Sequence, residues 1–189
     1  MRIITGSRRG RKLRTLEGQA VRPTPDRIKE ALFNILQFDV EGRVFLDLFA
    51  GSGQIGLEAL SRGAARAVFV DQAKASCAVV AENVKTTGFE EQAQIVNADY
   101  AAFLLRGAGP FDIAFLDPPY RTGILEKALS AVAPQMSRGG IVICEHPADE
   151  VLPDAAGGFV RTREYRYKNS ADRLPPRKHG LSGGEEDST

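Results

Sequence analysis

The chain has 189 residues, a net charge of +1 and a hydrophobic fraction of 43%, which indicates one globular domain with a single core. It has no apolar run of about 20 residues and no apolar segment after its basic N-terminus, so we expect neither a membrane span nor a secretory signal. With two cysteines, two histidines and no C-x-x-C motif, the chain is not expected to hold a metal centre or a disulfide framework, which fits a reducing cytoplasm. We also expect a monomer.

The first element is a basic arm. Residues 1–30 hold nine Lys or Arg and three Asp or Glu, so the rest of the chain is net negative. Turn signals at Gly6-Ser7 and Gly10 predict a small hairpin, which we expect at the rim of the functional site. A basic edge indicates a polyanionic partner such as RNA, and the lack of aromatic residues favours phosphate contacts over base reading. The RNA-binding candidates are Arg8, Arg9, Arg11, Lys12 and Arg14; the alternative is a solvated, mobile arm.

The segment RPTPDRIKEALFNILQF predicts the first helix. Thr24 can cap its start, Pro25 suits its first position, and Asp26 favours its positive end. Its expected apolar face consists of Ile28, Ala31, Leu32, Ile35 and Leu36.

Short apolar segments then alternate with helical ones, which predicts an α/β fold with a parallel sheet and helices on both faces. The expected strands are Val44–Ala50, Ala67–Asp71, Ala93–Asp99, Phe111–Asp117 and Gly139–Cys144. The expected helices are Ile55–Arg62, Lys74–Thr86, Ala101–Arg106 and Ile124–Met136.

Ligands of such sheets bind beyond the carboxyl ends of the strands. The first strand leads into a G-x-G-x-x-G loop of Gly51, Gly53 and Gly56, a pattern that nicotinamide and S-adenosylmethionine sites share. A pyrophosphate needs the positive end of the following helix. The carboxylate of Asp47 would oppose a pyrophosphate there but would suit the ammonium group of a methionine moiety.

Two further strands also end in acidic residues. Asp71 can accept hydrogen bonds from ribose hydroxyls, and Asp99, followed by Tyr100, can accept one from an adenine amino group. The alternative for each acid is a carboxylate that caps the next helix. The predicted cofactor-binding residues are Asp47, Gly51, Gly53, Asp71, Asp99, Tyr100 and Thr24.

The fourth strand ends in Asp117-Pro118-Pro119-Tyr120. Two prolines fix the backbone and remove two N–H donors, which leaves a rigid corner rich in acceptors. Asp117 and the Pro118 carbonyl can hold both hydrogens of a planar amino group, while Tyr120 offers a face for stacking a base. We predict Asp117, Pro118 and Tyr120 as catalytic residues, because hydride transfer has no use for such a corner.

The combination resembles the class I S-adenosylmethionine-dependent methyltransferases that act on exocyclic amines. RPTPDRIKEALFNIL followed by LDLFAGSGQIGLEALSRGA is similar to the bacterial 16S rRNA guanine-N2 methyltransferase family. The resemblance implies a Rossmann-like fold with a mostly parallel seven-stranded sheet and a reversed last strand. It also implies methyl transfer from S-adenosylmethionine to the N2 amine of a guanine in 16S rRNA, on the small ribosomal subunit or its assembly intermediate.

The expected organisation is a basic arm over residues 1–22, a methyltransferase domain over 23–176 and a disordered tail over 177–189. Pro175-Pro176 cannot lie in a central strand, so the last strand is expected to be very short, near Asp172–Leu174, or displaced. Three other functions stay open: adenine-N6 methylation of DNA or RNA, nicotinamide-dependent oxidoreduction, and RNA binding without catalysis.

Overall fold

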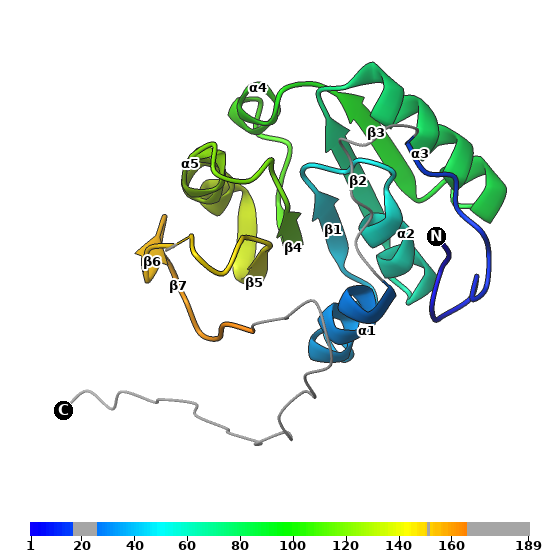
Figure 1. Ribbon diagram of the computed structural model, residues 1–189, viewed down its shortest axis with the longest axis horizontal. Helices are drawn as coiled ribbons and strands as arrows, with labels where there is room; N and C mark the ends of the chain where they lie inside the picture. Colours follow the sequence, from blue (N-terminus) through cyan, green and yellow to red (C-terminus); the bar gives the residue numbers. More distant parts are fainter. Residues whose placement is uncertain (17–25, 151, 166–189) are drawn as a thin grey trace.

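The computed structural model describes residues 1–16, 26–150 and 152–165. Its centre is a five-stranded sheet in the order β3-β2-β1-β4-β5, in which every neighbouring pair is parallel (Figure 1). The strand order reverses between β1 and β4, the position at which such sheets bind their ligands. The strands are β1 Val44–Asp47, β2 Arg66–Asp71, β3 Ala93–Asn97, β4 Phe111–Leu116 and β5 Met136–Cys144. The predicted class and the five predicted strands are confirmed.

The main sheet has five strands within the described residues, not the seven that the family resemblance implied. The next strands along the chain, β6 Ala155–Ala156 and β7 Phe159–Val160, form a separate antiparallel hairpin. Gly157 and Gly158, both with positive φ, make the two-residue turn that closes this hairpin. The segment near Asp172–Leu174, where a short last strand was expected, lies outside the described residues, as do the tail 177–189 and both predicted domain boundaries.

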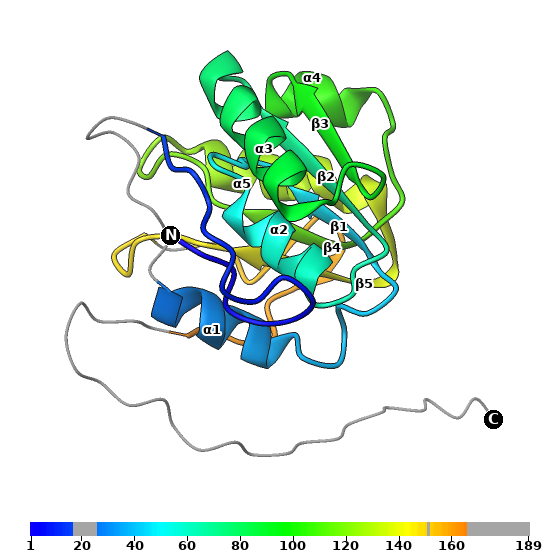
Figure 2. The same ribbon diagram turned by 90° about the vertical axis from the view of Figure 1, so that its right-hand side faces the viewer.

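Helices cover both faces of the sheet (Figures 1 and 2). The helices α1, α2 and α3 share one hydrophobic cluster with one face of the strands, and α4 and α5 share a second cluster with the other face. The bounds are α1 Asp26–Ile35, α2 Gln54–Ser61, α3 Lys74–Thr87, α4 Tyr100–Leu105 and α5 Ile124–Val132, followed by a short 3-10 turn, Ala133–Gln135.

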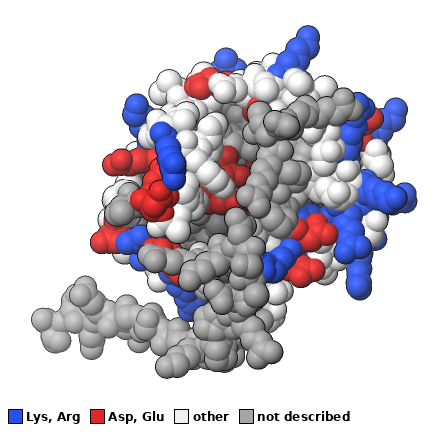
Figure 3. Space-filling view, viewed as in Figure 1, with Lys and Arg blue, Asp and Glu red and all other residues white. Residues whose placement is uncertain are grey.

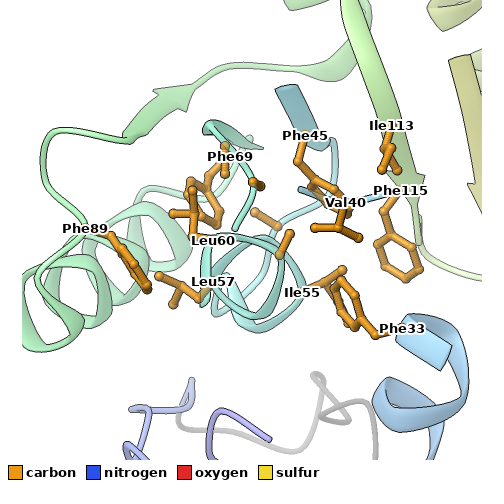
Figure 4. Packing of buried hydrophobic residues seen from close by; sticks show 14 of the residues in the cluster. Phe33, Val40, Phe45, Ile55, Leu57, Leu60, Phe69, Phe89, Ile113 and Phe115 are labelled. Atoms are coloured by element: carbon orange, nitrogen blue, oxygen red, sulfur yellow. The ribbon is translucent and has the colours of Figure 1, made fainter. Parts of the chain in front are cut away.

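The two-residue period of the strands divides the core between the faces. Phe45 and Phe69 point into the cluster with α2 and α3, which Figure 4 shows, whereas their neighbours Leu46 and Val68 point toward α4 and α5. Close packing fixes the glycine loop as well, because a Cβ on Gly56 would lie 2.3 Å from the Phe69 ring. The core thereby holds the start of α2 against β2.

The predicted apolar face of helix α1 is buried at Ala31, Leu32 and Leu36, and the structure departs from the prediction at three other positions. Ile35 is 41% exposed, while Phe33 and Lys29 are buried. Lys29 is accommodated because its Nζ donates to the Arg2 carbonyl and lies 3.9 Å from a carboxylate oxygen of buried Glu58. Desolvation lowers the pKa of Lys29, and Glu58 partly opposes that effect. A buried lysine with a partner on another helix leaves no trace in the apolar periodicity.

The basic arm forms the predicted small hairpin. Ile3 N–H donates to the Arg11 carbonyl and Gly10 N–H to the Ile3 carbonyl, both at 2.9 Å. The arm lies against α2, because Glu58 accepts the N–H groups of Ile4 and Thr5 at 2.7 and 2.9 Å. These contacts contradict a freely mobile arm for the described residues 1–16.

Candidate active site and nucleic-acid interface

Acidic side chains gather at the carboxyl edge of the sheet. Because the strands are parallel, the residues that end them meet at one edge, and the ends of β1 and β4 lie on either side of the switch in strand order. The acids at this edge are Asp47 at the end of β1, Asp71 at the end of β2, Asp99 after β3, Asp117 after β4 and Glu145 after β5.

Asp47 is a carboxylate buried at the start of a helix. Its side chain is 2% exposed, and its Oδ2 accepts the N–H of Gly56, in the first turn of α2, at 3.0 Å. Burial, with a smaller contribution from the charge of Asp71, raises its pKa to about 7 against the opposing effect of the Gly56 hydrogen bond. The positive end of α2 is thus already occupied by a carboxyl group of the protein itself. This arrangement disfavours a pyrophosphate and favours a cationic ligand group.

The glycine loop between β1 and α2 is open on its ligand side. Gly51 has a φ of +55°, and nothing lies within 4 Å of the position that a Cβ would occupy. Gly53, in the left-handed region, is the N-cap of α2. Gln54 follows, and its Oε1 is a buried atom without a hydrogen-bond partner among the described residues. An unpaired buried acceptor beside an open loop is typical of a site that expects a donor from a ligand.

Asp71 links the loop to the next helix. Its Oδ2 accepts the N–H of Gly51 at 2.9 Å, and its Oδ1 accepts the N–H of Ala73 at 2.8 Å. The side chain stays partly exposed, so each oxygen has a lone pair left for a hydroxyl. The side chain of Asp71 does not make the cap of α3, whose N-cap residue is Ala73. The role of Asp71 toward a ribose stays a prediction.

Asp99 caps a helix, as the alternative interpretation held. Its Oδ1 accepts the N–H groups of Ala101 and Ala102 at 2.9 and 3.2 Å and thereby starts α4. The ring of Tyr100 packs against that of Phe49 with centroids 5.4 Å apart. A contact of Asp99 or Tyr100 with a cofactor stays a prediction, and Thr24 lies outside the described residues.

The Asp117-Pro118-Pro119-Tyr120 corner follows β4 as predicted. Burial and, to a smaller extent, the carboxylates of Glu145 and Asp47 together raise the pKa of Asp117 to about 8. Tyr120 is 50% exposed and donates its hydroxyl to Glu145 Oε1 at 3.1 Å. An exposed ring beside a partly buried carboxyl gives this corner a flat face and an acceptor next to each other.

Glu145 is a site residue that the sequence argument missed. Its N–H donates to the Leu116 carbonyl at 2.9 Å, which places it beside Asp117 on the neighbouring strand. Burial raises the pKa of its carboxyl group, and the Tyr120 hydroxyl opposes that rise. The sequence contains a signal that could have identified Glu145, because this acid directly follows the apolar segment IVIC, as Asp117 follows IAFL. Gln54 was also missed, since only burial reveals its unpaired oxygen.

The tip of the basic hairpin, with Arg8, does not lie at the rim of this site, which corrects the expected position of the hairpin. Arg8 N–H donates to Ser61 Oγ at the end of α2, and its Nε donates to the Thr87 carbonyl at the end of α3. Both helices run antiparallel to the strands, so their C-terminal ends lie at the opposite edge of the sheet. The tip of the hairpin can pack closely against α2 because residue 6 is a glycine. A Cβ on Gly6 would overlap the Ser61 carbonyl. Only the open end of the hairpin approaches the glycine loop.

A basic cleft lies between the hairpin and the end of α3. It has a volume of about 340 Å³ and is lined by Ser7, Arg8, Arg9, Arg11, Lys85, Thr86, Thr87 and Gly88. Figure 3 shows Lys and Arg side chains gathered on the right-hand side, over the arm and α3. Arg8 is held over the Phe89 ring and Arg14 pairs with Glu82 at 2.6 Å, so Arg9 and Arg11 are the better candidates for phosphate contacts. Lys12 is exposed.

Within residues 1–16, 26–150 and 152–165, no group of three or more His, Cys, Asp or Glu is placed to hold a metal ion. The same residues contain no helix with the length and apolar character that a membrane crossing requires.

Comparison with known proteins places the chain in a family. Residues 1–174 match the family model described as conserved hypothetical protein 95. The chain is 37% identical to putative rRNA methyltransferase YlbH of Bacillus subtilis, over 88% of this chain and 94% of that protein. It is 35% identical to ribosomal RNA small subunit methyltransferase D of Escherichia coli K12, over 94% of this chain and 90% of that protein.

Solved structures agree. The putative methyltransferase yhhF from Escherichia coli superposes with a TM-score of 0.70 at 36% identity, covering 81% of this chain and 85% of that one. A putative methylase from Haemophilus influenzae gives a TM-score of 0.65 at 32% identity, covering 80% and 84%. The chain therefore belongs to the conserved hypothetical protein 95 family, which includes the bacterial proteins named ribosomal RNA small subunit methyltransferase D.

Proposed function

We propose that the protein transfers a methyl group from S-adenosylmethionine to the exocyclic N2 amine of a guanine in 16S rRNA. The observation that carries the proposal is the Asp117-Pro118-Pro119-Tyr120 corner after β4, across the switch in strand order from buried Asp47. The names of the family relatives, which include ribosomal RNA small subunit methyltransferase D, support the same activity and the same substrate class.

The described residues fit S-adenosylmethionine better than a dinucleotide. Asp47 has no cationic partner among the described residues, and its buried carboxylate suits the ammonium of a methionine moiety. Gly51 leaves open space beside the loop, and the unpaired Gln54 Oε1 lies at the start of α2. Asp71, at the end of β2, would accept ribose hydroxyls. When bound, this cofactor supplies a methyl group already activated on a sulfonium.

The residues of the corner would hold the acceptor amine. Asp117 Oδ and the Pro118 carbonyl would accept its two hydrogens and so orient its lone pair, and the Tyr120 ring would stack on the base. As the new N–C bond forms, the amine loses a proton, for which the Asp117 carboxylate is the nearest acceptor. The guanine has to leave its stack to enter, which costs a few kcal/mol and less in an RNA loop than in a duplex.

The basic arm would hold the RNA through phosphates. The side chains of Arg9 and Arg11 in the basic cleft make no hydrogen bond or ion pair within the described residues, and Lys85 adds a charge from α3. We infer that the partner is the small ribosomal subunit or an assembly intermediate, and that the enzyme acts as a monomer in the cytoplasm. Methyl transfer to purified 16S rRNA and to assembled subunits, measured in parallel, separates the two substrates, and light scattering measures the mass.

The test is mass spectrometry of 16S rRNA from a strain that lacks the gene, with and without complementation. We expect one guanine to lose its N2-methyl group and to regain it with the wild-type gene but not with Asp117→Ala. Methyl loss from an adenine would favour the adenine-N6 alternative. Unchanged rRNA, together with RNA binding in vitro, would favour a non-catalytic RNA-binding protein.

A further inference from the structure

Glu145 and Asp117 form a pair of carboxyl groups on neighbouring strands. The strands β4 and β5 are in register up to Leu116 and Cys144, and the Glu145 N–H continues the hydrogen bonding by donating to the Leu116 carbonyl at 2.9 Å. Neighbouring strands lie about 4.8 Å apart, so two acceptors face the same place beside the proline corner. The mechanism proposed above uses Asp117 and leaves Glu145 without a role.

Glu145 is held as an acceptor. The Tyr120 hydroxyl donates to its Oε1 at 3.1 Å, which leaves Oε2 free for a further donor. The hydroxyl stabilises the charged carboxylate, while the Glu145 charge raises the pKa of Asp117. No described basic side chain bonds to Glu145 or pairs with it, so Oε2 is available to a donor from a ligand.

The Watson–Crick edge of guanine has two donors side by side, the N1–H and the N2 amine. Adenine and cytosine instead place an acceptor, N1 or N3, next to their exocyclic amines. Two adjacent acceptors on the protein therefore match guanine and oppose the other two bases. The proline corner alone cannot make this choice, because it contacts only the amine that all three bases share.

We propose that Glu145 is the specificity-determining residue of the site and accepts the N1–H of the target guanine while Asp117 and the Pro118 carbonyl hold its N2 amine. The inference rests on the proposed function and adds to it the reason for the choice of base. Tyr120 has a second role in this arrangement, because its hydroxyl orients Glu145 while its ring stacks on the base.

The test uses 2-aminopurine, which keeps the exocyclic amine of guanine but has an acceptor at N1. It is placed at the mapped target position of the rRNA, and 6-thioguanine, which keeps N1–H and changes only the O6 position, serves as the control base. We expect the wild-type enzyme to methylate 2-aminopurine on the order of 100-fold less efficiently in kcat/KM than guanine, and 6-thioguanine within about tenfold of guanine.

Glu145→Gln provides the second arm, because a glutamine side chain can turn its NH₂ toward an acceptor. We expect this variant to lose on the order of 10- to 100-fold in kcat/KM on guanine and to bring 2-aminopurine within about tenfold of guanine. Glu150→Gln, in the same segment, is the matched control and should keep wild-type discrimination. Cofactor affinity and thermal unfolding of Glu145→Gln show whether the variant is folded.

The outcomes separate the two proposals. If no guanine is methylated by the wild-type enzyme, the proposed function is wrong. If guanine and 2-aminopurine are methylated equally by the wild-type enzyme, or if folded Glu145→Gln keeps the full preference for guanine, the function stands and the role of Glu145 is wrong.

Discussion

We expect the buried carboxylate of Asp47 to lower the free energy of unfolding and to contribute to cofactor binding. Its pKa rises from 3.8 to about 7 because the side chain is buried, and at 1.36 kcal/mol per pKa unit this corresponds to about 4 kcal/mol at pH 8. Between pH 3.8 and about pH 7, the pKa values of Asp47 in the unfolded and folded states, the folded protein binds more protons than the unfolded chain. The free energy of unfolding should therefore fall as pH rises through this window. Asp47→Asn removes the charge and keeps an oxygen that can accept the Gly56 N–H.

We expect Asp47→Asn to raise the free energy of unfolding at pH 8 by up to about 4 kcal/mol and to leave it nearly unchanged at pH 4. Urea unfolding followed by circular dichroism at both pH values measures the difference. Calorimetry of the same variant should give an S-adenosylmethionine dissociation constant at least about tenfold higher, because the ammonium loses its charged partner.

Asp112 is the matched control on the same pair of strands. It lies at the opposite end of β4 and accepts the Val44 N–H at 2.9 Å, and this bond lowers the pKa of its carboxyl group. Asp112→Asn should therefore lose stability at pH 8 and leave cofactor affinity unchanged. Equal stability of Asp47→Asn and wild type at pH 8 would show that the buried charge carries no cost, and the reasoning from burial would fail.

Further changes test the site and the arm. Wild-type kcat/KM should rise with pH toward a plateau above about 8, because the raised pKa of Asp117 keeps the proton acceptor protonated below that value, and Asp117→Ala should lose at least about 100-fold in turnover with cofactor affinity within a few-fold. Asp71→Ala should weaken S-adenosylmethionine binding in calorimetry and leave RNA binding unchanged; an unchanged cofactor constant would return Asp71 to a structural role. Neutralising Arg9 and Arg11 should weaken RNA binding and flatten the slope of log affinity against log salt by roughly 0.7–0.9 per lost contact, with the methylated base unchanged; a wild-type slope would exclude the cleft. Glu58→Ala should cost about 3–5 kcal/mol in urea unfolding, since it removes one of the two carboxylates near buried Lys29 and the acceptor of the Ile4 and Thr5 N–H groups; a loss below about 1 kcal/mol would contradict this role of Glu58.

The sheet could be predicted because its signals are local. Five apolar runs correspond to the five strands of the main sheet, and the acids that follow them lie at one edge because parallel strands bring like ends together. The predicted strand Val44–Ala50 is longer than β1, which ends at Asp47, because the chain already turns into the glycine loop there. A run of apolar letters does not distinguish a strand from a buried turn.

What could not be predicted depends on partners distant in the sequence. Glu145 belongs to the site only because β5 lies beside β4, and the order of strands is not written in any one segment. Lys29 and Glu58 are both fully buried because their polar atoms have partners in the N-terminal arm, Lys29 at the Arg2 carbonyl and Glu58 at the Ile4 and Thr5 N–H groups, whereas sequence alone would predict both residues at the surface. The hairpin was predicted from its glycines, but its place was set by Glu58 and Ser61 on α2.

The separation of the two regions has a consequence for the proposed substrate. The helix α3 has 14 residues and spans about 21 Å, from the carboxyl edge of the sheet to the basic cleft at its other end. Asn83 joins these regions, because it bonds both the Arg14 backbone of the arm and the Ser52 carbonyl of the glycine loop. An RNA that places a guanine at Asp117 and a phosphate at Arg9 must therefore extend across this face. Base selection and backbone anchoring would then be carried by different elements, which is why substitutions in one region should leave the other nearly intact.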